Sequence, residues 1–205
     1  MEKNVLLQIF KSKSTVLSFK EISLAAGPIS SDLLKRRLHY YVQNGELYAI
    51  RKGFYARDKH YDRREFATKL FTPSYISFET VLAEAGVIFQ YYSSIFVATY
   101  QSKDIVCDGQ EYLYKKLKDT ILVNTTGIEN RGAYFIASPE RAFLDVLYLN
   151  KNYYFDNLSV LNLDKILSIL PIYQNKRMEK AVHAQFNALK EDESYIKKCD
   201  VCGRV

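Results

Sequence analysis

The pattern that best predicts the fold is a stretch near the N-terminus, Ser30-Ser31-Asp32-Leu33-Leu34-Lys35-Arg36-Arg37-Leu38-His39-Tyr40-Tyr41-Val42-Gln43-Asn44. Wound as an α-helix at about 100° per residue, it places four apolar side chains on one face: Leu34, Leu38, Tyr41 and Val42. The serines at its start are good helix caps, and Gly45 follows its end as a stop signal. We therefore predict an amphipathic helix over Ser30 to Asn44.

The segments on either side of this helix predict its neighbours. A short helix is expected over residues 4–10, and another begins at Ser18, where Glu21 completes a capping-box pattern, and ends at Gly27-Pro28. After the helix, Leu47–Ala56 consists of two β-prone runs around a basic tip, which predicts a hairpin. Three helices followed by a hairpin make a winged helix-turn-helix domain.

The positive charge of the chain is concentrated in the same region. The 205 residues carry a formal net charge of +6, from 29 Lys and Arg against 23 Asp and Glu. Residues 1–65 hold 13 basic and 7 acidic residues, a net of +6, whereas residues 66–205 hold 16 of each and are neutral. A basic segment joined to a neutral body is typical of a module that binds a polyanion such as nucleic acid.

The polar face of the central helix and the hairpin tip supply the candidate DNA contacts. Arg, His and Gln side chains can reach base edges, whereas Lys, Ser and the free N–H groups at a helix start favour phosphates. A basic hairpin tip contacts the DNA backbone or the minor groove. The predicted DNA-binding residues are Ser30, Ser31, Lys35, Arg36, His39, Tyr40, Gln43, Arg51 and Lys52. We expect the partner to be double-stranded DNA, as an operator with inverted repeats.

A polar, charged segment at residues 57–64 marks the predicted domain boundary. Beyond this boundary the sequence predicts both helices and strands. Helices are expected over residues 64–71, 77–85, 138–147, 163–170 and 176–190, and strands near residues 95–100, 105–107, 112–117 and 133–137. The predicted fold class is therefore α+β, with an N-terminal winged helix-turn-helix domain at 1–62, a mixed α/β C-terminal domain at 63–192 and a tail at 193–205.

Composition excludes several classes of protein. The hydrophobic content of 48% excludes disorder, and no apolar run approaches the ~18 residues of a membrane helix. The first residues do not resemble a signal peptide, and three cysteines do not make a symmetrical disulfide framework. We therefore expect a soluble, cytoplasmic chain that does not interact with a membrane.

Catalytic and metal-binding motifs are sparse. The chain has no phosphate-binding Gly-rich loop, nucleophile elbow or zinc-protease helix, so neither an enzyme nor a cofactor is expected. Asp104, Asp108 and Glu111 are candidates for a nuclease metal site, but the sequence around Asp108 is typical of an exposed turn. Cys199 and Cys202 have the spacing of half a zinc site, whose other half is missing, so no metal is expected there.

Three segments carry a resemblance to a known family. Leu47–Ala56 has a hydrophobic, basic, glycine and aromatic order, Pro73–Leu82 forms a second motif, and Ala133–Asp145 joins a strand to an acidic-basic helix start. With these motifs the sequence, from about Val5 to Lys190, resembles the AbiEi family of antitoxins from bacterial type IV toxin–antitoxin, or abortive infection, systems. The resemblance implies a DNA-binding autorepressor whose C-terminal domain counteracts a co-encoded, nucleotidyltransferase-like toxin, with no stable complex required.

The motifs of the body contain the candidate antitoxin residues. These are Tyr75, Ser77, Glu79, Glu140, Arg141 and Asp145. A structural interpretation stands beside the functional one, because Tyr75 suits a core and Glu140 suits the first turn of a helix. Arg141 and Asp145 are four residues apart and can pair across one helical turn.

Two other functions are compatible with the sequence. The first is a stand-alone winged-helix regulator whose C-terminal domain senses a small ligand or a partner. The second is a metal-dependent nuclease that uses the carboxylates of Asp104, Asp108 and Glu111.

Overall fold

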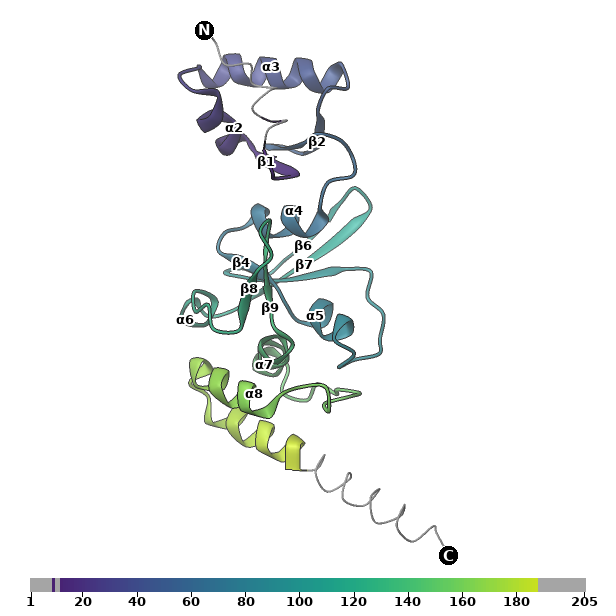
Figure 1. Cartoon of the computed structure of the whole chain (residues 1–205), viewed down its shortest axis with the longest axis vertical. Helices are drawn as coiled ribbons and strands as arrows, with labels where there is room; N and C mark the ends of the chain where they lie inside the picture. The colour runs from purple at the N-terminus through teal and green to yellow at the C-terminus, as the bar shows by residue number, and fades with distance from the viewer. Residues whose placement is uncertain (1–8, 10–11, 188–205) are drawn as a thin grey trace, which may run out of the picture.

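The computed structural model describes residue 9 and residues 12–187. The helix predicted over residues 4–10 lies outside this part of the chain except for Ile9, which is helical and buried, and Cys199 and Cys202 also lie outside it. The described chain is a mixed α+β structure, as predicted. Figure 1 shows it as an elongated molecule, with the N-terminal elements at one end and the last described helix at the other.

The first elements form a small sheet with two helices. In chain order they are β1 (Val16–Ser18), α2 (Phe19–Ala26), α3 (Ser31–Gln43), β2 (Tyr48–Arg51) and β3 (Phe54–Ala56). Both helices and the hairpin are present where the sequence predicts them. The capping box of Ser18 and Glu21 is formed, and the Ser30 hydroxyl accepts a hydrogen bond from the N–H of Leu33. Strand β1, which was not predicted, pairs antiparallel with β3, so the sheet order is β1-β3-β2.

The small sheet is shared between two hydrophobic cores. One core lies between the sheet and the helices and contains Leu17, Leu34 and Leu38. On the other face, Val16 and Ala56 join the large core of the rest of the chain. Neighbouring residues of a strand point to opposite faces, which is why Val16 and Leu17 enter different cores. The sheet thus attaches the N-terminal helices to the body.

A mixed six-stranded sheet forms the centre of the body. Its order is β6-β7-β5-β4-β9-β8. The strands are β4 (Ser74–Ile76), β5 (Ile95–Thr99), β6 (Lys103–Cys107), β7 (Gln110–Lys116), β8 (Ile128–Asn130) and β9 (Phe135–Ala137). The pairs β5–β7 and β4–β9 are parallel, and the other pairs are antiparallel. Strands β4 and β8 were not predicted, because three residues are too few to display an alternating pattern.

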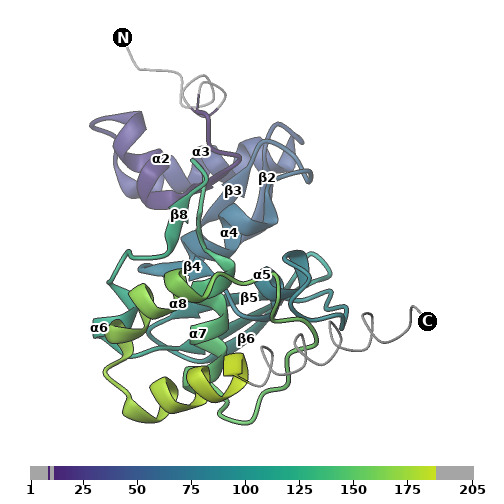
Figure 2. The same ribbon diagram turned by 60° about the horizontal axis from the view of Figure 1, so that its bottom comes forward.

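Helices cover the sheet on both sides. They are α4 (Arg63–Leu70), α5 (Glu79–Glu84), α6 (Asp119–Leu122), α7 (Pro139–Leu149), α8 (Leu163–Ile169), the 3₁₀ helix η1 (Leu170–Tyr173) and a final helix described over residues 176–187. Helix α4 lies on the side of the N-terminal elements, and α7 and α8 lie on the opposite side (Figure 1). Figure 2 shows α7, α8 and the final helix gathered at the end of the body. The prediction that α5 begins at Ser77 was wrong, because Phe78 takes a positive φ of 57° and the helix starts after it.

Candidate nucleic-acid interface

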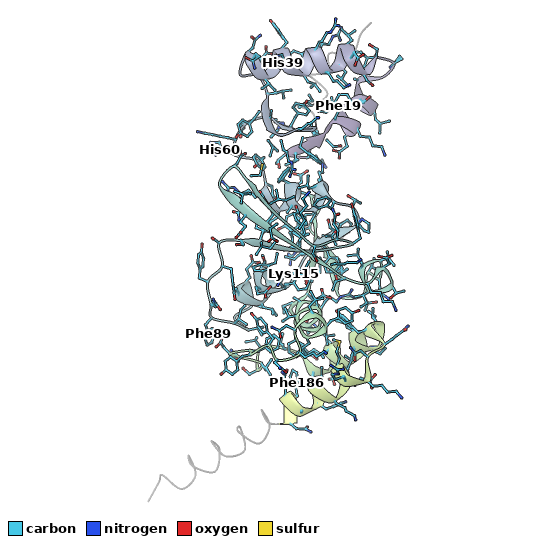
Figure 3. All side chains as sticks on the ribbon, turned by 180° about the vertical axis from the view of Figure 1, so that it is seen from behind. Phe19, His39, His60, Phe89, Lys115 and Phe186 are labelled. Atoms are coloured by element: carbon cyan, nitrogen blue, oxygen red, sulfur yellow. The ribbon has the colours of Figure 1, made fainter. Side chains whose placement is uncertain are left out.

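All nine predicted DNA-binding side chains are exposed. They lie at the start and along the outer face of α3, and at the tip of the β2–β3 hairpin. Leu34 and Leu38 on the opposite face of α3 are fully buried, so the predicted amphipathic orientation of this helix is confirmed. Figures 1 and 3 show α3, with the labelled His39, at the end of the molecule away from the body. The helix therefore presents a polar surface that no other described element covers.

Local contacts leave the outer face of α3 available to a ligand. Lys35 lies 3.4 Å from Asp32 one turn earlier, and both side chains are mostly exposed. An exposed pair of this kind contributes only about 0–1 kcal/mol, so a phosphate can compete for the lysine. Tyr40 is 59% exposed, and its ring meets that of Tyr41 edge-to-face at a centroid distance of 5.9 Å. Tyr41 packs against the small core, so the exposed ring of Tyr40 contacts a residue that is itself held by the core.

The hairpin tip lies beside the start of α2. The carbonyl of Gly53 accepts a hydrogen bond from the N–H of Phe19 at 2.7 Å, and Gly53 has a φ of +85°, which a glycine adopts without strain. Lys20, which follows Phe19 in the first turn of α2, is exposed, as are Arg51 and Lys52 at the tip. Lys20 was not among the predicted contacts, because its place beside the tip depends on the pairing of β1 with β3.

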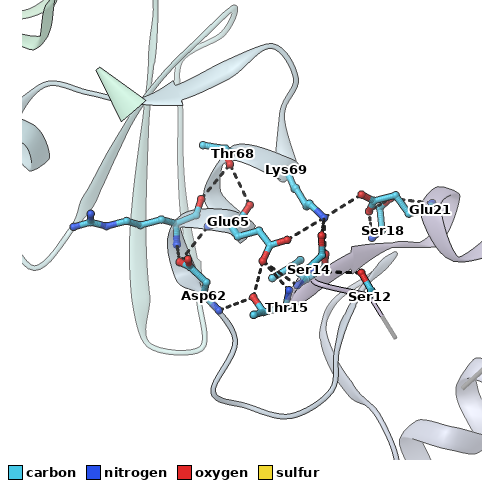
Figure 4. A network of polar contacts seen from close by, with 11 residues as sticks. Ser12, Ser14, Thr15, Ser18, Glu21, Asp62, Glu65, Thr68 and Lys69 are labelled. Carbon is cyan, nitrogen blue, oxygen red and sulfur yellow. Dashed lines mark hydrogen bonds and ion pairs between the residues drawn. The ribbon is translucent and has the colours of Figure 1, made fainter. Parts of the chain in front are cut away.

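Helix α4 holds the free edge of β1 through a buried carboxylate (Figure 4). Glu65 is fully buried, and it accepts hydrogen bonds from the N–H and hydroxyl of Thr15, at 2.8 and 2.6 Å, and from the N–H of Val16 at 3.3 Å. Strand β1 has a β-sheet partner on only one side, and Glu65 supplies the buried N–H of Val16 with an acceptor. We call these contacts of Glu65 with Thr15 and Val16 the clamp. The clamp helps to hold the N-terminal sheet, and with it α3, against the body.

A lysine completes the same clamp. Lys69 Nζ lies 2.6 Å from the carbonyl of Val16, 3.1 Å from Glu65 and 3.0 Å from Glu21 of α2. Burial raises the pKa of Glu21, but hydrogen bonds from Ser18 and the charge of Lys69 outweigh this effect and lower the pKa below its usual value. Lys69 therefore links β1, α2 and α4.

The carboxylates considered for a nuclease do not converge. Asp108 occupies the predicted turn between β6 and β7, with a φ of 50°, and it accepts a hydrogen bond from the hydroxyl of Tyr61 at 2.8 Å. Its backbone carbonyl also faces Arg63 of α4. Within the described part of the chain, no group of three or more His, Cys, Asp and Glu side chains is arranged to hold a metal ion. Asp108 instead helps to join the β6–β7 hairpin to the start of α4.

Four of the six candidate antitoxin residues meet in one buried network. Asp145 accepts hydrogen bonds from the hydroxyls of Ser77, Tyr75 and Tyr173 at 2.7, 3.0 and 2.6 Å. The Nε of Arg141 is 3.4 Å from the Asp145 carboxylate, which confirms the predicted pairing across one turn. Arg141 also donates to the carbonyls of Ile121 and Thr126 and to the hydroxyl of Tyr75. Tyr173 is the member that sequence reasoning missed.

The other two candidates make separate contacts. Glu79 is paired with Lys115, whose Nζ is 3.0 Å from the carboxylate and lies over the Phe78 and Phe96 rings. Figure 3 labels Lys115 near the middle of the body. Glu140 faces the N–H of Asn162 at 3.4 Å. All six candidates are buried, and this favours the structural interpretation of these residues.

Burial controls the protonation of the network. It raises the pKa values of Tyr75 and Tyr173 well above their usual range, and the nearby charge of Asp145 adds to the effect. Both hydroxyls therefore stay protonated and donate to Asp145. Burial also raises the pKa of Asp145, against the opposing effects of Arg141 and the three hydroxyls.

Comparison with known proteins adds no assignment. No protein-family model matches the sequence, and no curated protein sequence matches it. Among the helices that the structure describes, none has the length and apolar character needed to cross a membrane.

Proposed function

We propose that the N-terminal elements form a winged helix-turn-helix domain that binds double-stranded DNA. The supporting observation is the amphipathic placement of α3, whose apolar face is buried while every predicted base and phosphate contact is exposed. The chain order β1-α2-α3-β2-β3 and the sheet order β1-β3-β2 agree with this assignment. The concentration of net positive charge in residues 1–65 supplies the attraction to the DNA backbone.

Each part of this surface has a role in the proposed complex. Helix α3 enters the major groove, where Arg36, His39 and Gln43 occupy its outer face at spacings of three and four residues. Phosphates approach the N-terminal turn of α3, which has free N–H groups and serine hydroxyls. Arg51 and Lys52 contact the neighbouring backbone or minor groove. Contacts with bases thus determine the sequence specificity, and contacts with phosphates position the protein on the DNA.

A DNA-binding measurement tests this proposal. The probe is a labelled duplex from the region upstream of the protein's own gene, titrated at low salt and followed by fluorescence anisotropy. We expect Arg36→Ala to weaken binding by about 1–3 kcal/mol, because a base contact is lost. Arg131→Ala is the matched control, since Arg131 is an exposed arginine of the body. Equal binding by wild type and Arg36→Ala, or no binding at all, contradicts the proposal.

We infer a second role from the AbiEi resemblance, in which the chain represses its own operon and counteracts a co-encoded, nucleotidyltransferase-like toxin. The three motifs of the sequence support this role. Because the candidate residues in the body are buried, we assign them to the stability of the antitoxin domain and not to a contact with the toxin.

Co-expression separates the two roles. The protein and the neighbouring nucleotidyltransferase-like reading frame are expressed from unrelated promoters, and growth is measured. We expect wild type and Arg36→Ala to restore growth equally, because antagonism does not use α3. Failure of both to restore growth contradicts the antitoxin role and leaves a stand-alone regulator.

A further inference from the structure

A pocket at the end of the body distant from α3 has no part in the proposed DNA complex. It has a volume of about 480 Å³ and lies between the C-terminal end of α7, the loop that follows, and the start of the final helix. Figures 1 and 2 show these elements at the opposite end of the molecule from α3. The volume falls within the range of roughly 300–1,000 Å³ that is typical of small-molecule sites.

The pocket combines an apolar floor with a cationic rim. Leu147 and Met178 are buried beneath it, and Ala181 lines it beside them. The charged side chains that line it are Lys151, Arg177 and Lys180. No carboxylate lines the pocket, and within the described residues none of these three cations forms an ion pair.

Helix stability does not explain the positions of two of these cations. Arg177 is in the first turn of the final helix, where the positive end of the helix dipole disfavours a cation. Lys180 is three residues later, and like charges at this spacing repel each other. Lys176 is also in this first turn but does not line the pocket, so Arg177 and Lys180 are distinguished by their place on the pocket rim.

We propose that this pocket binds a nucleotide, with the phosphate on Lys151, Arg177 and Lys180 and the base on the apolar floor. The side-chain amides of Asn152 and Asn175 also line the pocket and offer donors and acceptors to a base or ribose. The Asn175 amide oxygen also accepts from the N–H of Arg177 at 3.1 Å, which holds it at the start of the helix. In this proposal the body binds a nucleotide, and this binding does not require DNA.

Calorimetric titration of the full chain tests the proposal. The probes are adenosine and guanosine 5′-monophosphate, with adenosine and inorganic phosphate as partial ligands. We expect at least one nucleotide to bind at least tenfold more tightly than either partial ligand, because it uses both the rim and the floor. Absence of nucleotide binding at millimolar concentration, or equally tight binding of phosphate or adenosine alone, overturns the proposal.

Variants assign the binding to this pocket. We expect Arg177→Ala/Lys180→Ala to weaken nucleotide binding at least tenfold, and Ala181→Trp to abolish it by filling the pocket while the cations remain. Lys176→Ala is the matched control on the same helix, since Lys176 is exposed and does not line the pocket. Arg36→Ala controls for phosphate binding at α3. Circular dichroism and thermal unfolding verify that each variant is folded, and unchanged binding in the double variant overturns the proposal.

Discussion

Glu65 and Thr15 are 50 residues apart in sequence, yet the Glu65 carboxylate accepts hydrogen bonds from both the N–H and the hydroxyl of Thr15. The bonds are 2.8 and 2.6 Å long, and the glutamate side chain is fully buried. Through this contact the first helix of the body holds the edge of the N-terminal sheet. This buried carboxylate therefore helps to fix the position of α3 relative to the body, together with Lys69 and the packing of Val16 and Ala56 in the large core.

Glu65→Gln tests this dependence. The substitution keeps the shape of the side chain but removes the charge that accepts from β1 and faces Lys69. We expect a loss of about 1.5–3 kcal/mol in the free energy of unfolding, measured by urea denaturation, because charged hydrogen bonds are lost in a buried site. Glu84→Gln, which removes the partly exposed partner of Arg64, should cost less than about 1 kcal/mol. Equal effects of the two substitutions would show that the clamp does not stabilise the fold.

The salt dependence of DNA binding tests the phosphate contacts. We expect Lys35→Ala and Lys52→Ala each to reduce the slope of log K against log salt concentration by about 1, with little change in preference among sequences. The measurement is anisotropy over a series of salt concentrations. Lys176→Ala should leave the slope unchanged, because Lys176 lies in the final helix, which Figure 1 shows at the opposite end of the molecule from α3. A slope unaffected by Lys35→Ala would remove this residue from the interface.

A double-mutant cycle tests the buried pair of Arg141 and Asp145. Arg141→Met or Asp145→Asn alone leaves an uncompensated buried charge, and we expect each to cost about 3–5 kcal/mol. The double variant should cost about 1–3 kcal/mol less than the sum of the single variants, because neither charge remains. Urea denaturation supplies the three values. Additive effects would mean that the two side chains do not interact.

Buried tyrosines make the fold sensitive to alkaline pH. Burial raises the pKa of Tyr112 to about 12, and the pKa values of Tyr75 and Tyr173 are also raised. A tyrosine whose folded pKa exceeds its unfolded value of about 10 contributes stability that is complete below pH 10 and is lost as the pH rises through the folded pKa. We expect cooperative unfolding above about pH 10, with buried tyrosines ionising together as the circular dichroism signal is lost.

Tyrosinate absorbance provides this measurement without interference, because the chain has 17 tyrosines and no tryptophan. Tyr112→Phe should shift the transition to higher pH, whereas Tyr91→Phe should not, since Tyr91 is 87% exposed. A smooth titration of every tyrosine near pH 10 with unchanged circular dichroism would refute the prediction.

Local sequence was sufficient to predict α2, α3 and the β2–β3 hairpin. The apolar stripe of α3, the capping box of Ser18 and Glu21, and the basic hairpin tip all act over a few residues, and the structure contains each of them. The pairing of Arg141 with Asp145 was predictable for the same reason, since one helical turn brings the two side chains together. The numbers of basic and acidic residues along the chain located the basic region from the sequence alone.

Tertiary structure decided which surfaces are joined and which residues are hidden. Strand β1 is three residues long and depends on β3 and on Glu65, which lie about 40 to 50 residues away. Four of the candidate antitoxin residues meet in one buried network because α7 brings Arg141 and Asp145 to Tyr75 of β4 and to Ser77, and Tyr173 of η1 enters this network from a segment with no motif. The cationic pocket likewise unites Lys151 with Arg177 and Lys180. Such relationships depend on contacts between distant segments, and neither helical periodicity nor strand alternation carries information about them.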